Sequence, residues 1–158
     1  MSSRAYIGLG ANLGADLGAT LSRAAQALAA LPGTRLVVLS SAWRSAPVDA
    51  TGPDFLNAVA ALDTALQPLA LLDALQAIEQ SHGRERPYRN APRTLDLDLL
   101  LYADVVMDTP RLTLPHPRLG ERAFVLRPLL EIAPHLGHLA VGDAWLGQRI
   151  EPAGPIAA

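Results

Sequence analysis

The chain has 158 residues and a formal net charge of −2; 50% of its residues are hydrophobic and 18% are charged. This length suits a single domain with one substantial core, and this composition excludes a disordered or fibrous protein. The apolar runs are far shorter than the ~18 residues that span a membrane, and no secretory signal is visible. We therefore expect a cytoplasmic protein without a membrane partner.

The sequence contains no cysteine and no lysine, so all 13 basic residues are arginines. The lack of cysteine excludes disulfides, thiolate nucleophiles and cysteine-bound metal centres. The lack of lysine excludes Schiff-base chemistry and the P-loop. Any phosphate chemistry must therefore use arginine, metal ions and backbone N–H groups. Because the net charge is negative, we expect no nucleic-acid partner.

The first half of the chain predicts strands and helices in alternation. Asp16 is placed to cap the first helix and Pro32-Gly33 to end it, while the glycines of residues 8–14 are typical of a tight turn before it. The expected elements, in chain order, are a strand over residues 5–9, a helix over 17–31, a strand over 34–44, a loop over 45–54, a strand over 55–62 and a helix over 68–83.

The second half predicts fewer regular elements. The expected segments are a basic loop over residues 84–93, a strand over 94–102, a short strand over 111–114, a helical region over 122–132 and a loose tail over 151–158. Residues 1–150 then form one domain. The order strand–helix–strand–strand–helix–strand predicts an α+β fold: a ferredoxin-like βαββαβ core, with helices packed on an antiparallel sheet.

The most specific feature is the stretch Thr94-Leu-Asp-Leu-Asp98. Alternate side chains of a strand share a face, so Asp96 and Asp98 project together while the leucines between them enter the core. Paired carboxylates repel each other unless a cation lies between them, and Mg²⁺ accepts one or two carboxylates together with substrate phosphates. The alternative interpretation is the solvated face of a half-buried strand.

Arginines are concentrated in the loop just before these carboxylates. Cations and anions placed together suit a metal–polyphosphate ligand, although a surface loop kept soluble by its charges is the simpler interpretation. The arginines of this loop are Arg84, Arg86, Arg89 and Arg93.

Other polar residues could line a pocket. Phe55 and Asn57 share a strand face, and an amide suits the edge of a heterocycle, unless they are a core aromatic beside a turn-binding asparagine. Gln76 and Glu79 follow Leu72 at helical spacing, which is also typical of the border of a buried face. His116 lies between two prolines, which favours either a ligand contact or a surface histidine.

Several stretches together resemble one family, the 6-hydroxymethyl-7,8-dihydropterin pyrophosphokinases of folate biosynthesis. The most specific is Pro-Arg-Thr-Leu-Asp-Leu-Asp-Leu over residues 92–99. The other matching stretches cover residues 6–14, 53–57, 83–86, 112–118, 122–124 and 129–134. The resemblance implies a Mg²⁺-dependent transfer of a pyrophosphoryl group from ATP to the hydroxymethyl group of the reduced pterin, releasing AMP.

The resemblance also implies roles for individual residues. Asp96 and Asp98 would hold two Mg²⁺ ions, and Arg84 and Arg93 would be loop cations that neutralise the phosphates. The implied ATP contacts are Leu72, Gln76, Glu79, Arg86, Arg89, Leu99, Leu112, Thr113, His116 and Arg122. The implied pterin contacts are Ser45, Val48, Phe55, Asn57 and Phe124. We expect the protein to act as a monomer.

Two other functions are compatible with some of these residues. A non-catalytic module that senses a nucleotide or pterin would not need the paired carboxylates. A metal-dependent nuclease could use Asp96 and Asp98, with the arginine loop on a nucleic-acid backbone. The net charge and the small aromatic fraction of 4% both disfavour the nuclease.

Overall fold

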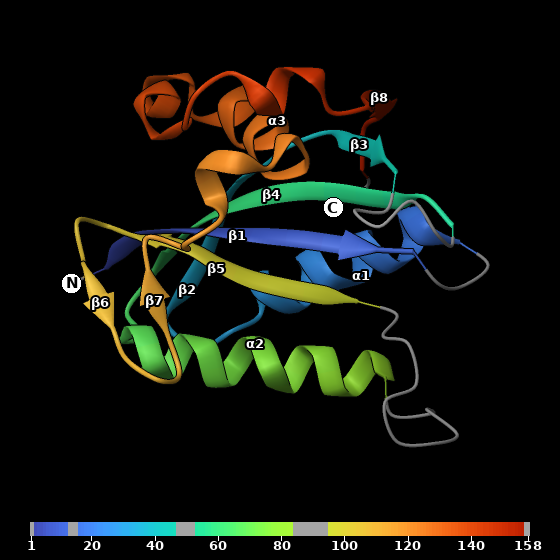
Figure 1. The fold of residues 1–158 in the computed structure, drawn as a ribbon. Coiled ribbons are helices and arrows are strands. Elements are labelled where there is room, and N and C mark those ends of the chain that lie inside the picture. Colours follow the sequence, from blue (N-terminus) through green and yellow to red (C-terminus); the bar gives the residue numbers. More distant parts are fainter. Residues whose placement is uncertain (1, 13–15, 47–52, 84–94, 157–158) are drawn as a thin grey trace.

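The computed structural model describes residues 2–12, 16–46, 53–83 and 95–156 (Figure 1). The strands are β1 (Ser3–Ala11), β2 (Thr34–Leu39), β3 (Ala42–Ser45), β4 (Phe55–Thr64), β5 (Asp96–Tyr102), β6 (Met107–Asp108), β7 (Thr113–Leu114) and β8 (Ile150–Gly154). The helices are α1 (Leu17–Ala29), α2 (Pro68–Gly83) and α3 (Ala123–Ile132), with 3-10 helices η1 (Leu119–Glu121), η2 (Pro134–Leu139) and η3 (Ala144–Gly147). None of the helices in these described ranges is long and apolar enough to cross a membrane.

The strands form a six-stranded sheet in the order β5-β1-β4-β3-β8, with β2 paired to β4 next to β3. Every pairing is antiparallel. β6 and β7 make a separate two-stranded sheet. With β2 and β3 taken as one interrupted strand, the order is that of the ferredoxin-like βαββαβ core, which confirms the predicted fold class.

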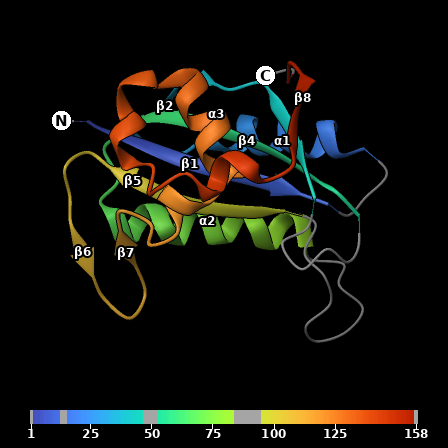
Figure 2. The same cartoon turned by 45° about the horizontal axis from the view of Figure 1, so that its top comes forward.

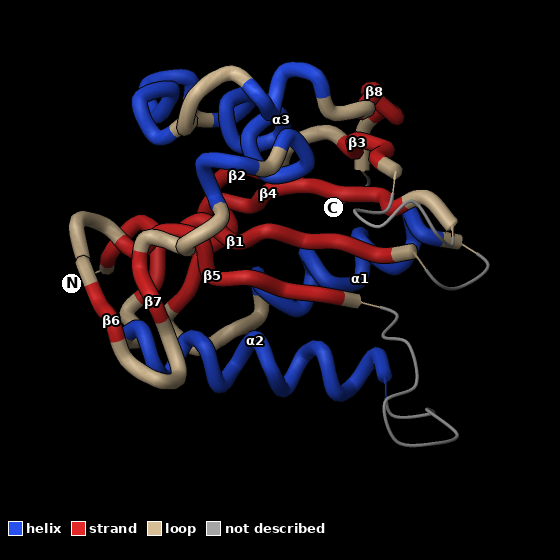
Figure 3. Tube along the Cα trace, in the orientation of Figure 1, coloured by secondary structure: helices blue, strands red, loops and turns tan. Residues whose placement is uncertain are grey.

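The sheet has a helical layer on each face (Figures 1 and 3). Alternation along β1 sends Ala5, Ile7 and Leu9 into one core with α1 and α2, and sends Tyr6 into a second core with α3. The rotated view of Figure 2 shows α3 and the C-terminal segment lying across the sheet on the face opposite α2. α3 therefore belongs to the core of the fold, because it covers the sheet face that α1 and α2 leave open.

Local signals account for the limits of the first helix. The Asp16 carboxylate accepts a hydrogen bond from the N–H of Ala19 at 3.0 Å, which is the predicted N-cap. After the helix, Gly33 adopts φ +58°, the left-handed conformation that favours glycine. The chain can therefore turn sharply into β2.

Three regions differ from the sequence prediction. The single strand expected over 34–44 is two strands, because the hydroxyl of Ser40 accepts the N–H of Val59 and interrupts the ladder between them. Residues 107–108 pair with β7, although no strand was predicted there. Residues 151–154 were expected in a loose tail, but they belong to β8, which pairs with β3 and is thereby held in the sheet.

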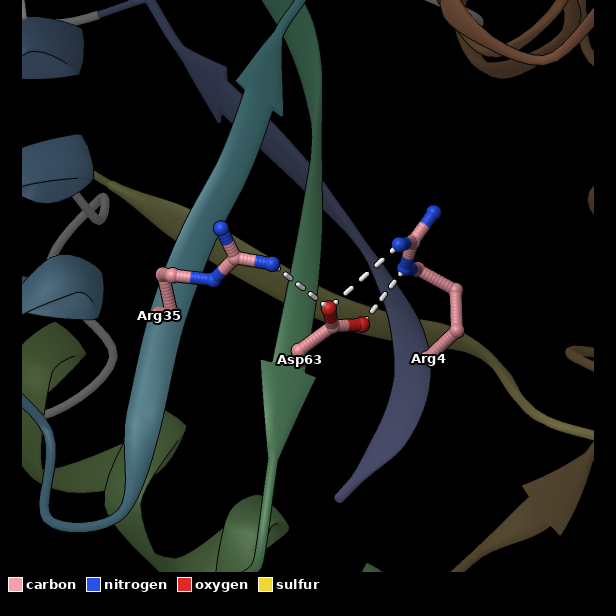
Figure 4. Close-up of polar contacts among 3 residues, drawn as sticks. All are labelled: Arg4, Arg35 and Asp63. Atoms are coloured by element: carbon pink, nitrogen blue, oxygen red, sulfur yellow. Dashed lines mark hydrogen bonds and ion pairs between the residues drawn. The ribbon is translucent and has the colours of Figure 1, made fainter.

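A row of charges crosses the sheet at the start of β1 (Figure 4). Asp63 of β4 is in register with Arg4 of β1 on one side and with Arg35 of β2 on the other. Its carboxylate forms ion pairs with both guanidinium groups, at 2.7 Å to Arg4 and 3.2 Å to Arg35. The hydrogen bond from Arg4 is the main reason that the pKa of Asp63 lies below its usual value. This row of charges supports the register of β1, β4 and β2 at one end of the sheet.

Candidate active site

A pocket of about 320 Å³ lies between the sheet and the first turn of α3. This is the size of a small-molecule site, and residues from β1, β3, β4, β5 and α3 line it. The lining residues are Gly8, Leu9, Gly10, Ser45, Ala46, Phe55, Asn57, Ala58, Asp96, Asp98, Arg122, Phe124 and Val125.

Two glycines of β1 make room for this pocket. Gly8 pairs with Asp98, and Gly10 pairs with Asp96 on one side and Asn57 on the other. They were assigned to a tight turn, but β1 continues to Ala11 and places both on the pocket face. Since glycine has no side chain, the strand is bare where the carboxylates project. The sequence signal for this arrangement is the pair of glycines two residues apart at the end of an apolar strand, which the turn assignment did not use.

The structure brings together the two aspartates that were predicted to share a face. Asp96 is half-buried, Asp98 is exposed, and both line the pocket from β5. Within the described ranges, no group of three or more histidine, aspartate and glutamate side chains could hold a metal ion. Two carboxylates without further protein ligands fit Mg²⁺, which completes its shell with water and substrate phosphates.

Glu79 of α2 fixes the strand between these aspartates. Its carboxylate accepts the backbone N–H of Leu97 at 2.8 Å. The bond joins α2 to β5 at the residue that separates Asp96 from Asp98. This bond orients the backbone that carries both carboxylates, whereas the predicted ATP contact of Glu79 stays a prediction.

Asn57 presents its amide oxygen to the pocket. The amide nitrogen donates to the backbone oxygen of Trp43 at 3.2 Å and to the hydroxyl of Ser45 at 2.8 Å. Both amide hydrogens are thus committed to β3, and the oxygen points at Gly10, where an added Cβ would lie 3.4 Å from it. Asn57 is 3% exposed, so this acceptor is held in one direction and suits an N–H donor on a ligand.

The aromatic and cationic walls come from β4 and α3. Phe55 and Phe124 both line the pocket and are half-buried, as expected for side chains that would lie against a flat ring. The guanidinium of Arg122 lies 5.3 Å from the centre of the Phe124 ring. The pocket lining therefore combines the apolar surface of two aromatic rings with the cation of Arg122 and the carboxylates of Asp96 and Asp98.

His116 lies close enough to Asp98 and Arg122 to sense their charges. Its backbone N–H donates to Leu100 of β5 at 2.9 Å, which ties the loop after β7 to the carboxylate strand. Partial burial lowers the pKa of His116, the charge of Asp98 opposes this shift, and the neighbouring arginines add to it. Together these effects favour the uncharged form of the ring.

The remaining predicted residues fall into two groups. Leu72, Leu99 and Leu112 belong to the core beneath β5, with Thr113 half-buried on β7 and Gln76 exposed on α2. Leu99 lies on the carboxylate strand and the others lie on neighbouring segments; none of them lines the pocket, and their ATP contacts stay a prediction. The predicted residues that lie outside the described ranges are Val48, Arg84, Arg86, Arg89 and Arg93.

Comparison with known proteins identifies the family. Residues 6–134 match the profile of the family described as 7,8-dihydro-6-hydroxymethylpterin-pyrophosphokinase (HPPK). The chain belongs to this family. The matched range runs from β1 to just beyond α3 and so contains every residue that lines the pocket.

Two curated relatives carry the name 2-amino-4-hydroxy-6-hydroxymethyldihydropteridine pyrophosphokinase. The protein from Pseudomonas aeruginosa is 51% identical over 137 residues, which cover 86% of this chain and 84% of the relative. The protein from Methylorubrum extorquens is 48% identical over 155 residues, which cover 96% of both chains.

Solved structures show the same fold at lower identity. A crystal structure of a triple mutant of HPPK-DHPS from Plasmodium falciparum has a TM-score of 0.70 and 12% sequence identity, covering 91% of this chain. A structure of HPPK-DHPS in complex with substrates has a TM-score of 0.68 and 13% identity. The chain spans about two-fifths of the length of these solved chains, 41% and 40%.

Proposed function

We propose that the chain transfers the pyrophosphoryl group of ATP to the hydroxymethyl group of 6-hydroxymethyl-7,8-dihydropterin, in folate biosynthesis. The observation that carries this is the pocket itself. Paired carboxylates on β5 face a heterocycle-sized space lined by two aromatic rings and a buried amide, in a chain of the HPPK family.

The pocket lining supports the pterin contacts that the family resemblance implies. The oxygen of Asn57 accepts an N–H from the edge of the heterocycle, while Phe55 and Phe124 lie against its faces. Ser45 orients Asn57 through its hydroxyl, at 2.8 Å from the amide nitrogen. Val48 is included from the family resemblance alone.

The triphosphate is placed beside the carboxylates. Asp96 and Asp98 would hold Mg²⁺, two ions by resemblance to the family, and a bound metal would supply positive charge that offsets the charge of the triphosphate. Arg122 lines the pocket within reach of the same charge. The adenine contacts assigned from the resemblance lie on β5 or on the segments beside it. Arg84, Arg86, Arg89 and Arg93 supply further cations in this proposal.

The chemistry needs little more from the protein than position and charge. The pterin hydroxymethyl oxygen bonds to the β-phosphorus, the bond from that phosphorus to the α–β bridging oxygen breaks, and AMP leaves with the electron pair. The hydroxyl proton passes to solvent. Phosphoryl transfer of this kind depends mainly on in-line placement and electrostatic stabilisation, so arginines and a metal suffice without lysine.

The identity of the nucleotide product tests the proposal. Incubation with Mg²⁺-ATP and hydroxymethyl-dihydropterin should yield AMP in step with pterin consumption, and none without pterin. ADP as product would instead indicate an ordinary kinase. Tight ATP binding without turnover would indicate the binding module.

Asp98→Ala tests the proposed metal site, because it removes one of the two carboxylates. Turnover should fall by roughly two orders of magnitude or more, as expected when a group that stabilises transition-state charge is removed. The pterin affinity measured without ATP should stay close to that of the wild type. Full activity of this variant, or activity in excess EDTA, would remove the proposed metal site.

A further inference from the structure

The first turn of α3 is capped by a residue from another part of the chain. Arg122 is the N-cap residue of α3, and its own side chain makes no capping hydrogen bond. The first N–H groups of a helix have no partner within the helix and need one elsewhere. The side chain of Gln148 supplies it, because its amide oxygen accepts the N–H of Ala123 at 2.8 Å.

The nitrogen of the Gln148 amide also makes a hydrogen bond. The nitrogen of Gln148 donates to the backbone oxygen of Glu121 at 2.9 Å. One planar group therefore holds the residues on both sides of Arg122. Glutamine suits this position because it offers a donor and an acceptor together, whereas glutamate lacks the donor and arginine lacks the acceptor.

The residues held in this way belong to the pocket. Arg122 and Phe124 line it, and the cation lies over the ring. Behind them is a second cavity of about 680 Å³, lined by Gln148 and again by Arg122, Phe124 and Ser45. Gln148 thus supports the pocket wall from the side opposite the pocket.

The segment that carries Gln148 is itself fixed at two places. Before it, Trp145 of η3 lies against α3, with the guanidinium of Arg127 5.1 Å from its ring centre. After it, β8 pairs with β3, and Ile150 is in register with Ser45. The segment therefore ties the α3 wall of the pocket to the β3 wall.

We propose that Gln148 is a positioning residue for the pterin side of the pocket, holding Phe124 and Arg122 in place through the backbone. This inference rests on the function proposed above. Its distinctive consequence is selective: loss of the amide contacts should weaken pterin binding, which uses Phe124, more than binding of Mg²⁺-ATP, for which Arg122 is the one predicted contact at this helix start and the metal carboxylates lie on β5.

The test compares Gln148→Met, which keeps the side-chain length and removes both hydrogen bonds, with Gln148→Glu, which keeps one acceptor. The control is Gln26→Met on the exposed face of α1. Dissociation constants for hydroxymethyl-dihydropterin and for Mg²⁺-ATP, kcat, KM and the melting temperature are measured for each variant. All binding is measured well below the lowest melting temperature.

For Gln148→Met we expect the pterin dissociation constant and KM to rise roughly fivefold to tenfold, the size of effect expected from losing one to two net hydrogen bonds. The constant for Mg²⁺-ATP should change less than about twofold, and Gln148→Glu should recover part of the pterin affinity. Pterin binding within twofold of the Gln26→Met control would overturn the proposal, as would equal losses for both substrates.

Pterin binding and AMP formation by the wild-type protein distinguish failure of the positioning role from failure of the proposed function. If the wild type neither binds the pterin nor forms AMP, the proposed function fails. If the wild type does both and the Gln148 variants match it, only the positioning role fails. Should Gln148→Met not fold, the intermediate affinity expected of Gln148→Glu still decides the question.

Discussion

At the scale of single residues, the site depends on two positions of β1 that are glycines and so carry no side chain. Gly8 and Gly10 lie opposite the aspartates of β5, so the floor of the pocket is bare backbone. A Cβ on Gly10 would lie 3.4 Å from the oxygen of Asn57 and 3.8 Å from the ring of Phe55, ordinary contact distances. An added methyl group would thus be tolerated by the fold while occupying space meant for a ligand.

We expect Gly10→Ala to weaken binding of hydroxymethyl-dihydropterin about tenfold, or ~1.4 kcal/mol. The methyl group covers the acceptor of Asn57, whereas replacing a glycine in a strand tends to stabilise the chain by restricting its unfolded state. Titration of the pterin and a thermal melt check the two effects.

The control is Gly137→Ala, since an added Cβ at Gly137 meets nothing within 4 Å. Pterin affinity should be unchanged in that variant. If Gly10→Ala also keeps wild-type affinity, then the pterin does not lie against β1.

At the scale of elements, α3 is fastened at both ends to segments distant in sequence. Gln148 caps its first turn, and Glu131 near its last turn binds the start of β3. The carboxylate of Glu131 accepts the N–H of Ser41 at 2.9 Å, the Ser41 hydroxyl at 2.7 Å and the indole N–H of Trp43 at 2.9 Å. Burial alone would raise the pKa of Glu131, but these bonds outweigh it and the pKa lies below its usual value.

Glu131→Gln should lower the free energy of unfolding by about 1 kcal/mol at neutral pH, since one acceptor is lost from a partly exposed, charged site. Because the pKa is depressed in the folded state, the carboxylate stabilises the fold above its unfolded pKa, about 4.3. That contribution is lost as the pH falls through the lower folded value. The difference between wild type and variant should therefore shrink on acidification.

Denaturant titrations between neutral pH and about pH 3 measure this difference. Glu151→Gln, at an exposed position on β8, is the matched control and should show no such change. A constant difference between wild type and Glu131→Gln across this range would contradict the assignment.

The same element scale shows what the sequence can and cannot predict. The alternation around Asp96 and Asp98 is local, so the shared face was predictable and is confirmed. The interruption between β2 and β3 was not, because it depends on the Ser40 hydroxyl accepting the N–H of Val59, which lies on another strand nineteen positions along the chain. β8 was missed for the same reason: its proline and glycine indicate a loose segment, and only pairing with β3 makes it a strand.

At the scale of the whole molecule, the exposed large hydrophobic side chains are dispersed. Among the described residues they are Val38, Leu69, Val106, Val141 and Leu146, which come from separate elements and loops. Single exposed apolar side chains are normal on monomeric proteins, whereas a stable dimer usually needs a continuous patch.

We therefore expect the protein to be a monomer of 16.7 kDa at micromolar concentration. Size-exclusion chromatography with light scattering measures the mass directly, with and without Mg²⁺-ATP. A mass twice this value that persists on dilution would show that a second copy contributes.

The bond between Glu79 and Leu97 has a consequence beyond the site. β5 ends the strand order, and the open edge of a sheet invites pairing with a strand of another molecule. Here the N–H of Leu97 is taken by the Glu79 carboxylate, and the carbonyl of Leu100 by the N–H of His116. The carboxylate-bearing strand can thus lie at the rim of the sheet, open to a bulky nucleotide, while its edge is protected against intermolecular aggregation.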